Sequence, residues 1–298
     1  MLNLNTLSQL ANMHQSALSA PVKSFELGTH RFNPWPDVSL MGVVNLSSDS
    51  WYRESVVLTV EAAVRRGLRL ATEGACLIDV GAESTLLAAG RVDASQQTQR
   101  LLPVIEQLHA AGVLVSVETY HPSVTQACLQ AGAAVINLTA GRDTGVFYRL
   151  AAEHGAGVII CYIQEAANVR EVADFTRQDD PVTLLYDYFA RELEAAVAAG
   201  CERIWIDPGL GFYYRNLQDS AVRVRHQMET FLNTFRLRSL GWPVCHALPH
   251  AFEYFEEEVR CAEPFFAVMA LLGQTDLLRT HEVARVLGVI KTLGVMPS

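Results

Sequence analysis

Seven apolar segments of this chain end in, or are followed at once by, side chains that can bind a ligand. These side chains are amides, carboxylates, imidazoles and one guanidinium: Asn45, Asp79, Glu118, Asn137, Asp207, His250 (in the segment 246–250), and Arg279 with His281. An ionised carboxylate accepts N–H donors, and an amide both donates and accepts. The carboxylates and the amide of Asn137 together suit a planar heterocycle that carries several N–H groups.

The other side chains of this set suit an anion. The planar fork of an arginine such as Arg279 matches the geometry of a phosphate, and His281 and Asn45 add further polar groups. Any one of these residues is about as well explained by a turn or a cap in a loop. If the fold brings all of them together, a site for a heterocycle and a phosphate is the better interpretation.

The segments that carry these residues have the pattern of strands buried on both faces. Residues 39–44, for example, form a short apolar run that turns polar at Asn45. Eight such strands are expected, over residues 39–44, 76–81, 113–118, 134–138, 157–161, 203–207, 243–247 and 276–279. They alternate with eight expected helices, over residues 59–73, 95–111, 122–131, 145–154, 181–200, 217–239, 263–272 and 281–293. Asp180 before Pro181 has the residue types of a helix N-cap and first turn.

This alternation predicts an α/β fold, a (β/α)8 TIM barrel with a short N-terminal helix/hairpin extension. An open, doubly wound sheet is the alternative, but it needs fewer strands or a second domain, and no linker-like segment divides the chain. Residues 24–298 are expected to form one barrel after an extension over residues 1–23, with a hairpin at residues 25–32. Ligands bind at the C-terminal ends of barrel strands, so the polar residues are expected to meet at one mouth.

Composition argues against several classes of partner. The formal net charge is −9, without the lysine and arginine clusters that nucleic-acid binding needs. The six cysteines are scattered without CxxC pairs, which is typical of buried thiols in a reducing cytosol, and a cytoplasmic protein is expected. No signal peptide is expected at the N-terminus. No segment approaches the roughly 20 apolar residues that span a bilayer, so no membrane partner is expected.

The chain resembles dihydropteroate synthase, a (β/α)8 enzyme of folate biosynthesis, over about residues 24–293. Six segments carry the resemblance: Met41-Gly42-Val43-Val44-Asn45-Leu46-Ser47-Ser48-Asp49-Ser50-Trp51, Asp79-Val80-Gly81-Ala82-Glu83-Ser84-Thr85, Ser116-Val117-Glu118-Thr119-Tyr120, Ala134-Val135-Ile136-Asn137, Asp207-Pro208-Gly209-Leu210-Gly211-Phe212 and Arg279-Thr280-His281-Glu282-Val283. One such segment is a weak signal, whereas six in order at barrel spacing are specific.

In that family a hydroxymethyl-dihydropterin diphosphate reacts with para-aminobenzoate, and diphosphate leaves with the help of Mg²⁺. The resemblance implies that Asn45, Arg279 and His281 hold the diphosphate and take part in catalysis, with Asn45 as a metal ligand. It also implies a homodimer, formed around the helix at residues 217–239. The implied substrate-binding residues are Asp79, Glu118, Asn137, Asp207 and His250.

The chain departs from the family pattern around the expected acceptor side. An arginine of the second loop is replaced by Leu86, and a lysine and an arginine after the seventh strand by His250 and Pro249; further differences are Ser48, Arg53 and the longer carboxylate Glu118. Three interpretations stay open: a divergent dihydropteroate synthase, an enzyme of the same fold with a different substrate or acceptor, and an impaired paralogue that binds a ligand or a partner subunit. A pterin-binding methyltransferase is a more distant option.

Overall fold

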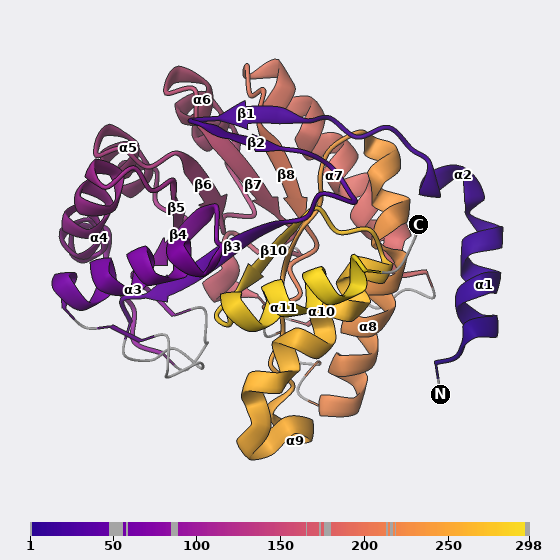
Figure 1. The fold of residues 1–298 in the computed structure, drawn as a ribbon. Coiled ribbons are helices and arrows are strands. Elements are labelled where there is room, and N and C mark those ends of the chain that lie inside the picture. Colours follow the sequence, from indigo (N-terminus) through magenta and orange to yellow (C-terminus); the bar gives the residue numbers. More distant parts are fainter. Residues whose placement is uncertain are drawn as a thin grey trace.

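Eight parallel strands form a nearly closed barrel surrounded by helices (Figure 1). The computed structural model describes residues 2–47, 56–57, 59–84, 89–164, 166–172, 174–175, 180–212, 214, 217 and 219–295. The strands are β3 (Ser39–Asn45), β4 (Leu77–Gly81), β5 (Val115–Thr119), β6 (Val135–Leu138), β7 (Gly157–Cys161), β8 (Ile204–Asp207), β9 (Cys245–Ala247) and β10 (Leu277–Thr280). Their order is β8-β7-β6-β5-β4-β3-β10-β9, and a bridge between Ile206 and Val244 joins the two ends. The predicted (β/α)8 TIM barrel is confirmed.

Helices follow the strands as the sequence predicts. They are α3 (Val60–Glu73), α4 (Ala94–Ala110), α5 (Pro122–Gln130), α6 (Gly145–Glu153), α7 (Pro181–Ala198), α8 (Ser220–Leu237), α10 (Ala262–Leu272) and α11 (Val283–Leu293). Asp180 caps α7 by accepting from the N–H of Val182, as predicted. Short helical segments were not predicted: η2 (Val169–Glu171), η4 (Arg238–Leu240), α9 (Phe252–Phe255) and η5 (Glu256–Cys261). Their shortness explains this, because three to six residues give no helical period to detect.

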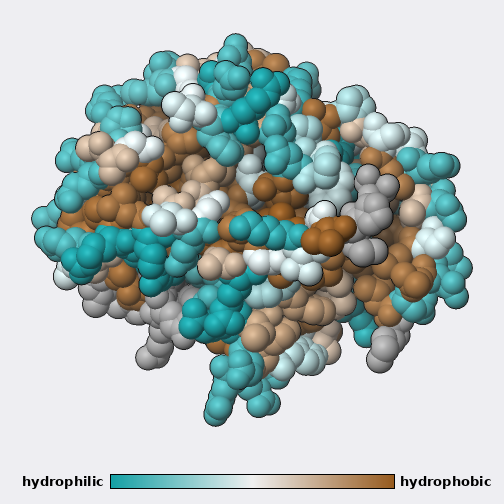
Figure 2. Space-filling model, in the orientation of Figure 1, coloured by the Kyte–Doolittle hydropathy of each residue, from teal (hydrophilic) through white to brown (hydrophobic). Residues whose placement is uncertain are grey.

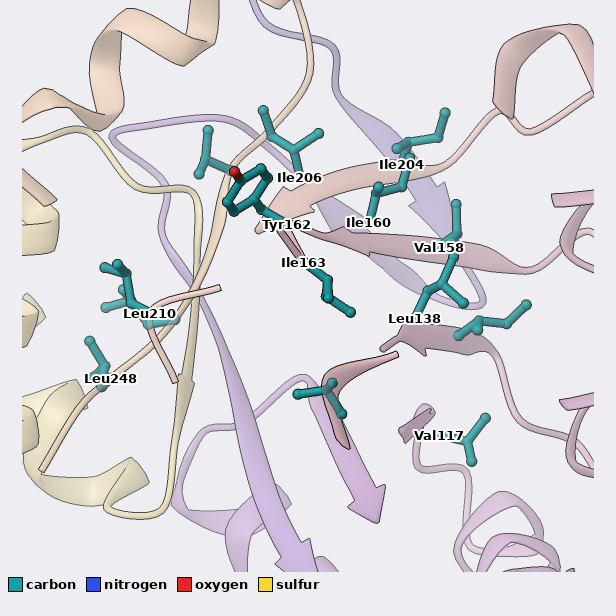
Figure 3. Close-up of a cluster of buried hydrophobic side chains, with 14 of the residues drawn as sticks. Val117, Leu138, Val158, Ile160, Tyr162, Ile163, Ile204, Ile206, Leu210 and Leu248 are labelled. Atoms are coloured by element: carbon teal, nitrogen blue, oxygen red, sulfur yellow. The ribbon is translucent and has the colours of Figure 1, made fainter. Parts of the chain in front are cut away.

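The alternation of side chains along each strand decides what enters the barrel. On β8, Ile204 and Ile206 belong to the large apolar cluster shared with the helices, whereas Trp205 belongs to a smaller cluster. Figure 3 shows part of the large cluster, including Val158 and Ile160 of β7 beside Ile204 and Ile206. Asp207 shares the alternation phase of Trp205. The same period places Asp79 of β4, Glu118 of β5, Asn137 of β6 and Arg279 of β10 on the inner face.

An apolar layer closes the N-terminal end of the barrel. It joins Met41, Leu77, Val135, Ile159, Trp205, Cys245 and Leu277 to residues of the hairpin β1 (Phe25–Leu27) and β2 (His30–Phe32). Phe25 and Phe32 meet the Trp205 ring edge-to-face at centroid distances of 4.6 and 4.9 Å. Aromatic pairs of this geometry add about 0.5–1.5 kcal/mol each beyond burial. The predicted hairpin is thus confirmed, and it covers the N-terminal end of the barrel.

Of the N-terminal helices α1 (Leu4–Met13) and α2 (Gln15–Leu18), α2 packs against α8, and α1 lies further out (Figure 1). The ring of His14 lies 6.4 Å from that of Phe235 on α8, and α1 buries no residue fully. The helix expected to form a homodimer is therefore partly covered by the chain's own extension, and the homodimer stays a prediction. Hydrophilic and hydrophobic residues are interspersed on the face in Figure 2.

Among the described residues, no helix is both long and apolar enough to cross a membrane.

Candidate active site

A pocket lies at the C-terminal ends of the strands, and seven of the eight predicted site residues line it. These are Asn45, Glu118, Asn137, Asp207, His250, Arg279 and His281. Lining residues that were not predicted include Glu83, Ser84, Thr139, Cys161, Phe212 and Gln227. The strands that supply the predicted residues are far apart in sequence, so only closure of the barrel brings them together.

Arg279 is bonded to two carboxylates from neighbouring strands. Its Nε donates to Oδ2 of Asp79 at 2.7 Å, and its Nη2 donates to Oε2 of Glu118 at 2.6 Å. The sequence analysis assigned Arg279 to the diphosphate, and Asp79 and Glu118 to the heterocycle. In the structure these three side chains contact one another, because the inner-face residues of β4, β5 and β10 project into the same space.

Asp79 lies beneath the pocket and is not one of its lining residues. It is fully buried, and its two oxygens accept from Ser116 Oγ at 2.7 Å, Asn137 Nδ2 at 3.0 Å and Arg279 Nε at 2.7 Å. Hydrogen bonds to an ionised group are short and strong, so they fix the rotamers of both partners. Asp79 therefore positions Asn137 and Arg279, and its expected contact with substrate stays a prediction.

Burial changes the acid–base behaviour of two pocket carboxylates. Burial raises the pKa of Glu118 to about 7, although Arg279 opposes the shift. Burial also raises the pKa of Asp207 to about 6, opposed by the hydrogen bond that the Gly209 N–H donates to Oδ1 at 2.8 Å. Both carboxylates thus titrate near neutral pH, where perturbed groups of an active site commonly do.

The other side of the mouth is built on Glu263, a fully buried carboxylate at the start of α10. Its Oε1 lies 2.7 Å from Nδ1 of His281 and 3.0 Å from Nε2 of His250. The Nε2 of His281 lies 3.5 Å from Nδ2 of Asn45. Burial alone would raise the pKa of Glu263, but His281 and His250 hold it below its usual range, so this carboxylate is ionised.

The sequence analysis did not predict Glu263, because this residue lies on a helix and not at the end of a strand. Glu83 follows β4 and was quoted only as part of a motif. Its carboxylate accepts from Tyr120 Oη, from Gln97 Nε2 at 3.2 Å and from the N–H of Val92 at 3.2 Å. Nothing in the sequence distinguishes Glu263 from the other glutamates of residues 253–263, since its role depends on where α10 docks.

Arg170, also missed, is a buried arginine in the connection between β7 and α7. It donates from Nη1 to the carbonyl oxygen of Ser84 at 2.8 Å and from Nη2 to that of Ala89 at 2.6 Å, and its Nε lies 3.5 Å from Oε1 of Glu83. These bonds hold the loop after β4, the second loop of the family motif, at Ser84 and at Ala89. Leu86, the predicted departure inside that loop, lies outside the described residues, as do Ser48 and Arg53 of the first loop.

His246 belongs to the segment that the sequence placed at the mouth, but it faces the other way. It is fully buried against α8, with Nε2 2.7 Å from Thr234 Oγ1 and its ring 4.7 Å from that of Phe231. Burial lowers its pKa to about 3, so it is neutral. Of the two histidines in this segment, only His250 reaches the pocket, because His246 is on the outer face of β9.

Comparison with known proteins identifies the family of the chain. The profile of the family described as "Pterin binding enzyme" matches residues 41–247. Dihydropteroate synthase of Streptococcus pyogenes serotype M6 is 32% identical over 212 residues, which cover 70% of this chain and 73% of the relative.

Solved structures give the same result. Dihydropteroate synthase of Xanthomonas albilineans with 4-aminobenzoic acid has a TM-score of 0.72 and 30% identity, covering 88% of this chain and 95% of that chain. The enzyme of the same organism in complex with 7,8-dihydropteroate has a TM-score of 0.73 and 28% identity, covering 92% and 100%. The barrel, the inner-face polar residues and these similarities agree: the chain belongs to the dihydropteroate synthase family of pterin-binding enzymes.

Proposed function

We propose that this protein transfers a hydroxymethyl-dihydropterin group, or a closely related one, from its diphosphate ester to an amine acceptor. The bond between the methylene carbon and the diphosphate oxygen breaks, a carbon–nitrogen bond forms, and the acceptor nitrogen loses a proton. Diphosphate is the leaving group. The proposal rests on one observation: Glu118, Asn137, Asp207 and Arg279 all line the same part of the pocket, which we call the pterin side.

The chemistry of that side fits a pterin ring. A pterin presents adjacent N–H donors and acceptors in one plane, which two carboxylates, an amide and a guanidinium can satisfy. Since Asp79 holds both Asn137 and Arg279, this hydrogen-bonding edge is formed before the ligand arrives. Preorganised polar groups cost no reorganisation at the moment of reaction.

Asn45 and His281 would hold the diphosphate at the other side of the mouth. Mg²⁺ prefers oxygen ligands and keeps several waters, and it is usually bound through substrate phosphates. Asn45 offers one amide oxygen, so its fit is to an ion held mainly by the diphosphate. When bound, Mg²⁺ supplies positive charge that neutralises the leaving group.

The donor half of the proposal is tested by calorimetry with the pterin diphosphate and Mg²⁺, and the reaction by release of diphosphate in the presence of para-aminobenzoate. The expected result is saturable binding of the pterin diphosphate together with release of diphosphate. Binding without turnover would identify a ligand-binding paralogue. If no pterin binds, the proposal is wrong.

We propose that the acceptor differs from that of most family members, because His250 replaces a lysine. His250 stacks on Phe252 at 5.2 Å with an interplanar angle of 23°, and its Nε2 faces Glu263. A lysine carries a fixed charge near neutral pH, whereas an imidazole is charged only when its surroundings favour it. A less anionic acceptor than para-aminobenzoate suits such a site.

Replacing His250 by lysine is expected to raise kcat/KM for para-aminobenzoate about tenfold. A full charge near an anion contributes about 1 kcal/mol in water, and several times more in a partly buried site. Steady-state assays of diphosphate release give the ratio, with His250→Gln as the uncharged control. Equal values for the two variants would show that charge at this position does not select the acceptor.

Pterin affinity is expected to weaken as the pH falls from 8 to 5.5. Glu118 and Asp207, with pKa values raised to about 7 and about 6, gain protons over this range and lose acceptor sites for pterin N–H groups. Below each pKa the affinity falls at most about tenfold per pH unit for each proton taken up. Calorimetry with 6-hydroxymethylpterin across the range measures the slope. A flat profile would contradict a role of these carboxylates as ionised acceptors.

A further inference from the structure

Five polar groups of the protein approach the carboxylate of Glu263. Its Oε2 accepts from Thr280 Oγ1, from the N–H of His281 at 2.9 Å and from the N–H of Glu282 at 3.1 Å. Its Oε1 faces the imidazole nitrogens of His281 and His250. One carboxylate oxygen offers about two lone-pair sites, so the three donors already satisfy Oε2. Oε1 is the oxygen that both imidazoles approach.

Oε1 and the two imidazole nitrogens are placed to bind one cation between them. The imidazole nitrogens that face Oε1 would then turn their lone pairs to the ion, and Oε2 would keep its three protein donors. Ligating carboxylates in metal sites are commonly held by such outer hydrogen bonds. We propose that His250, Glu263 and His281 form a site for a divalent transition metal such as Zn²⁺, separate from the Mg²⁺ expected with the diphosphate.

The distances are close to those of a metal site. Zn²⁺ binds histidine nitrogens at about 2.0–2.1 Å and carboxylate oxygens at about 2.0–2.2 Å, so its ligand atoms lie about 3.0–4.2 Å apart. Here Oε1 of Glu263 is 2.7 and 3.0 Å from the two nitrogens, and all three ligand atoms lie within 4.8 Å of one another. Small side-chain rotations of the histidines therefore suffice, because the carboxylate already lies between them.

The ligand set selects the class of metal. Two imidazoles and one carboxylate suit Zn²⁺ or Fe²⁺, whereas Mg²⁺ and Ca²⁺ prefer oxygen ligands alone. Three protein ligands leave a further coordination position, as catalytic zinc sites do. His250 and His281 both line the pocket, so that position faces the substrate space. His250 replaces the usual lysine of the family, and this substitution completes the set.

The test uses the full chain without any pterin, so its outcome does not depend on the proposed reaction. Chelator-treated protein is titrated with Zn²⁺ by calorimetry and with Co²⁺ by visible absorption. One ion per chain is expected, with Co²⁺ bands typical of four or five ligands and without the near-ultraviolet band of a sulfur ligand. His250→Gln should bind at least about 100-fold more weakly, since even outer ligand changes cost 10–100-fold.

His226→Gln is the matched control, because His226 also packs its ring on an aromatic residue, Phe175 at 4.6 Å, and does not line the pocket. It should bind Zn²⁺ like the unaltered chain. Glu263→Gln tests the carboxylate, and circular dichroism shows whether that variant folds. Loss of binding only in His250→Gln and folded Glu263→Gln supports the site. Absent Co²⁺ bands, or equal binding by His250→Gln, would show that the three residues form only a hydrogen-bonded cluster.

Discussion

Replacing Arg279 by methionine is expected to lower the free energy of unfolding by about 3–5 kcal/mol and to abolish pterin binding. Removing one partner of a buried ion pair leaves an uncompensated charge, which is the source of this cost. Here two carboxylates lose their partner, since Arg279 bonds both Asp79 and Glu118. Urea denaturation followed by circular dichroism measures the stability, and calorimetry measures the binding.

A double variant separates the two effects. Combining Arg279→Met with Glu118→Gln removes one of the stranded charges, so part of the lost stability is expected to return, while pterin binding stays absent. Arg279→Lys is the second control, because a single ammonium cannot reproduce the fork that reaches two strands. A loss of stability below about 1 kcal/mol in Arg279→Met would contradict the central place given to this guanidinium.

The Asp207→Asn variant is expected to bind pterin at least about 100-fold more weakly without loss of stability. Two hydrogen bonds to a charged acceptor contribute about 1.5–3 kcal/mol each, and 1.4 kcal/mol corresponds to a factor of ten. The amide oxygen of asparagine can still accept from the Gly209 N–H, so the loop after β8 keeps its turn. The amide nitrogen cannot accept from a ligand.

The Asp207→Asn change is expected to weaken pterin binding but not to lower the stability of the fold. The pKa of Asp207 is raised by burial, so its ionised form opposes folding as the pH rises through about 6. At pH 8 the asparagine variant is therefore expected to be as stable as the unaltered chain, or slightly more stable. Thermal melts and calorimetry at pH 8 measure both properties. Unchanged affinity would show that Asp207 does not contact the pterin.

Much of the site follows from the period of the strands. A barrel strand buries both faces, and its alternation sends residues of one phase inward. Asp79, Asn137 and Asp207 are in that phase on β4, β6 and β8, and each is near the end of an apolar run. These local features are readable in the sequence, and the predicted strands therefore led to seven of the residues that line the pocket.

The sequence alone thus determined the barrel, its hairpin and seven of the residues at its mouth, because these depend on patterns within a few neighbouring positions. Only the tertiary structure decided which of them touch. Arg279 pairs with Asp79 across 200 positions, and Glu263 joins His250 to His281. Such contacts depend on the register between strands and on the docking of α10, which no local pattern encodes. For the same reason Asp79 lies beneath the pocket. His246, by contrast, faces away because the alternation of β9 places it on the outer face.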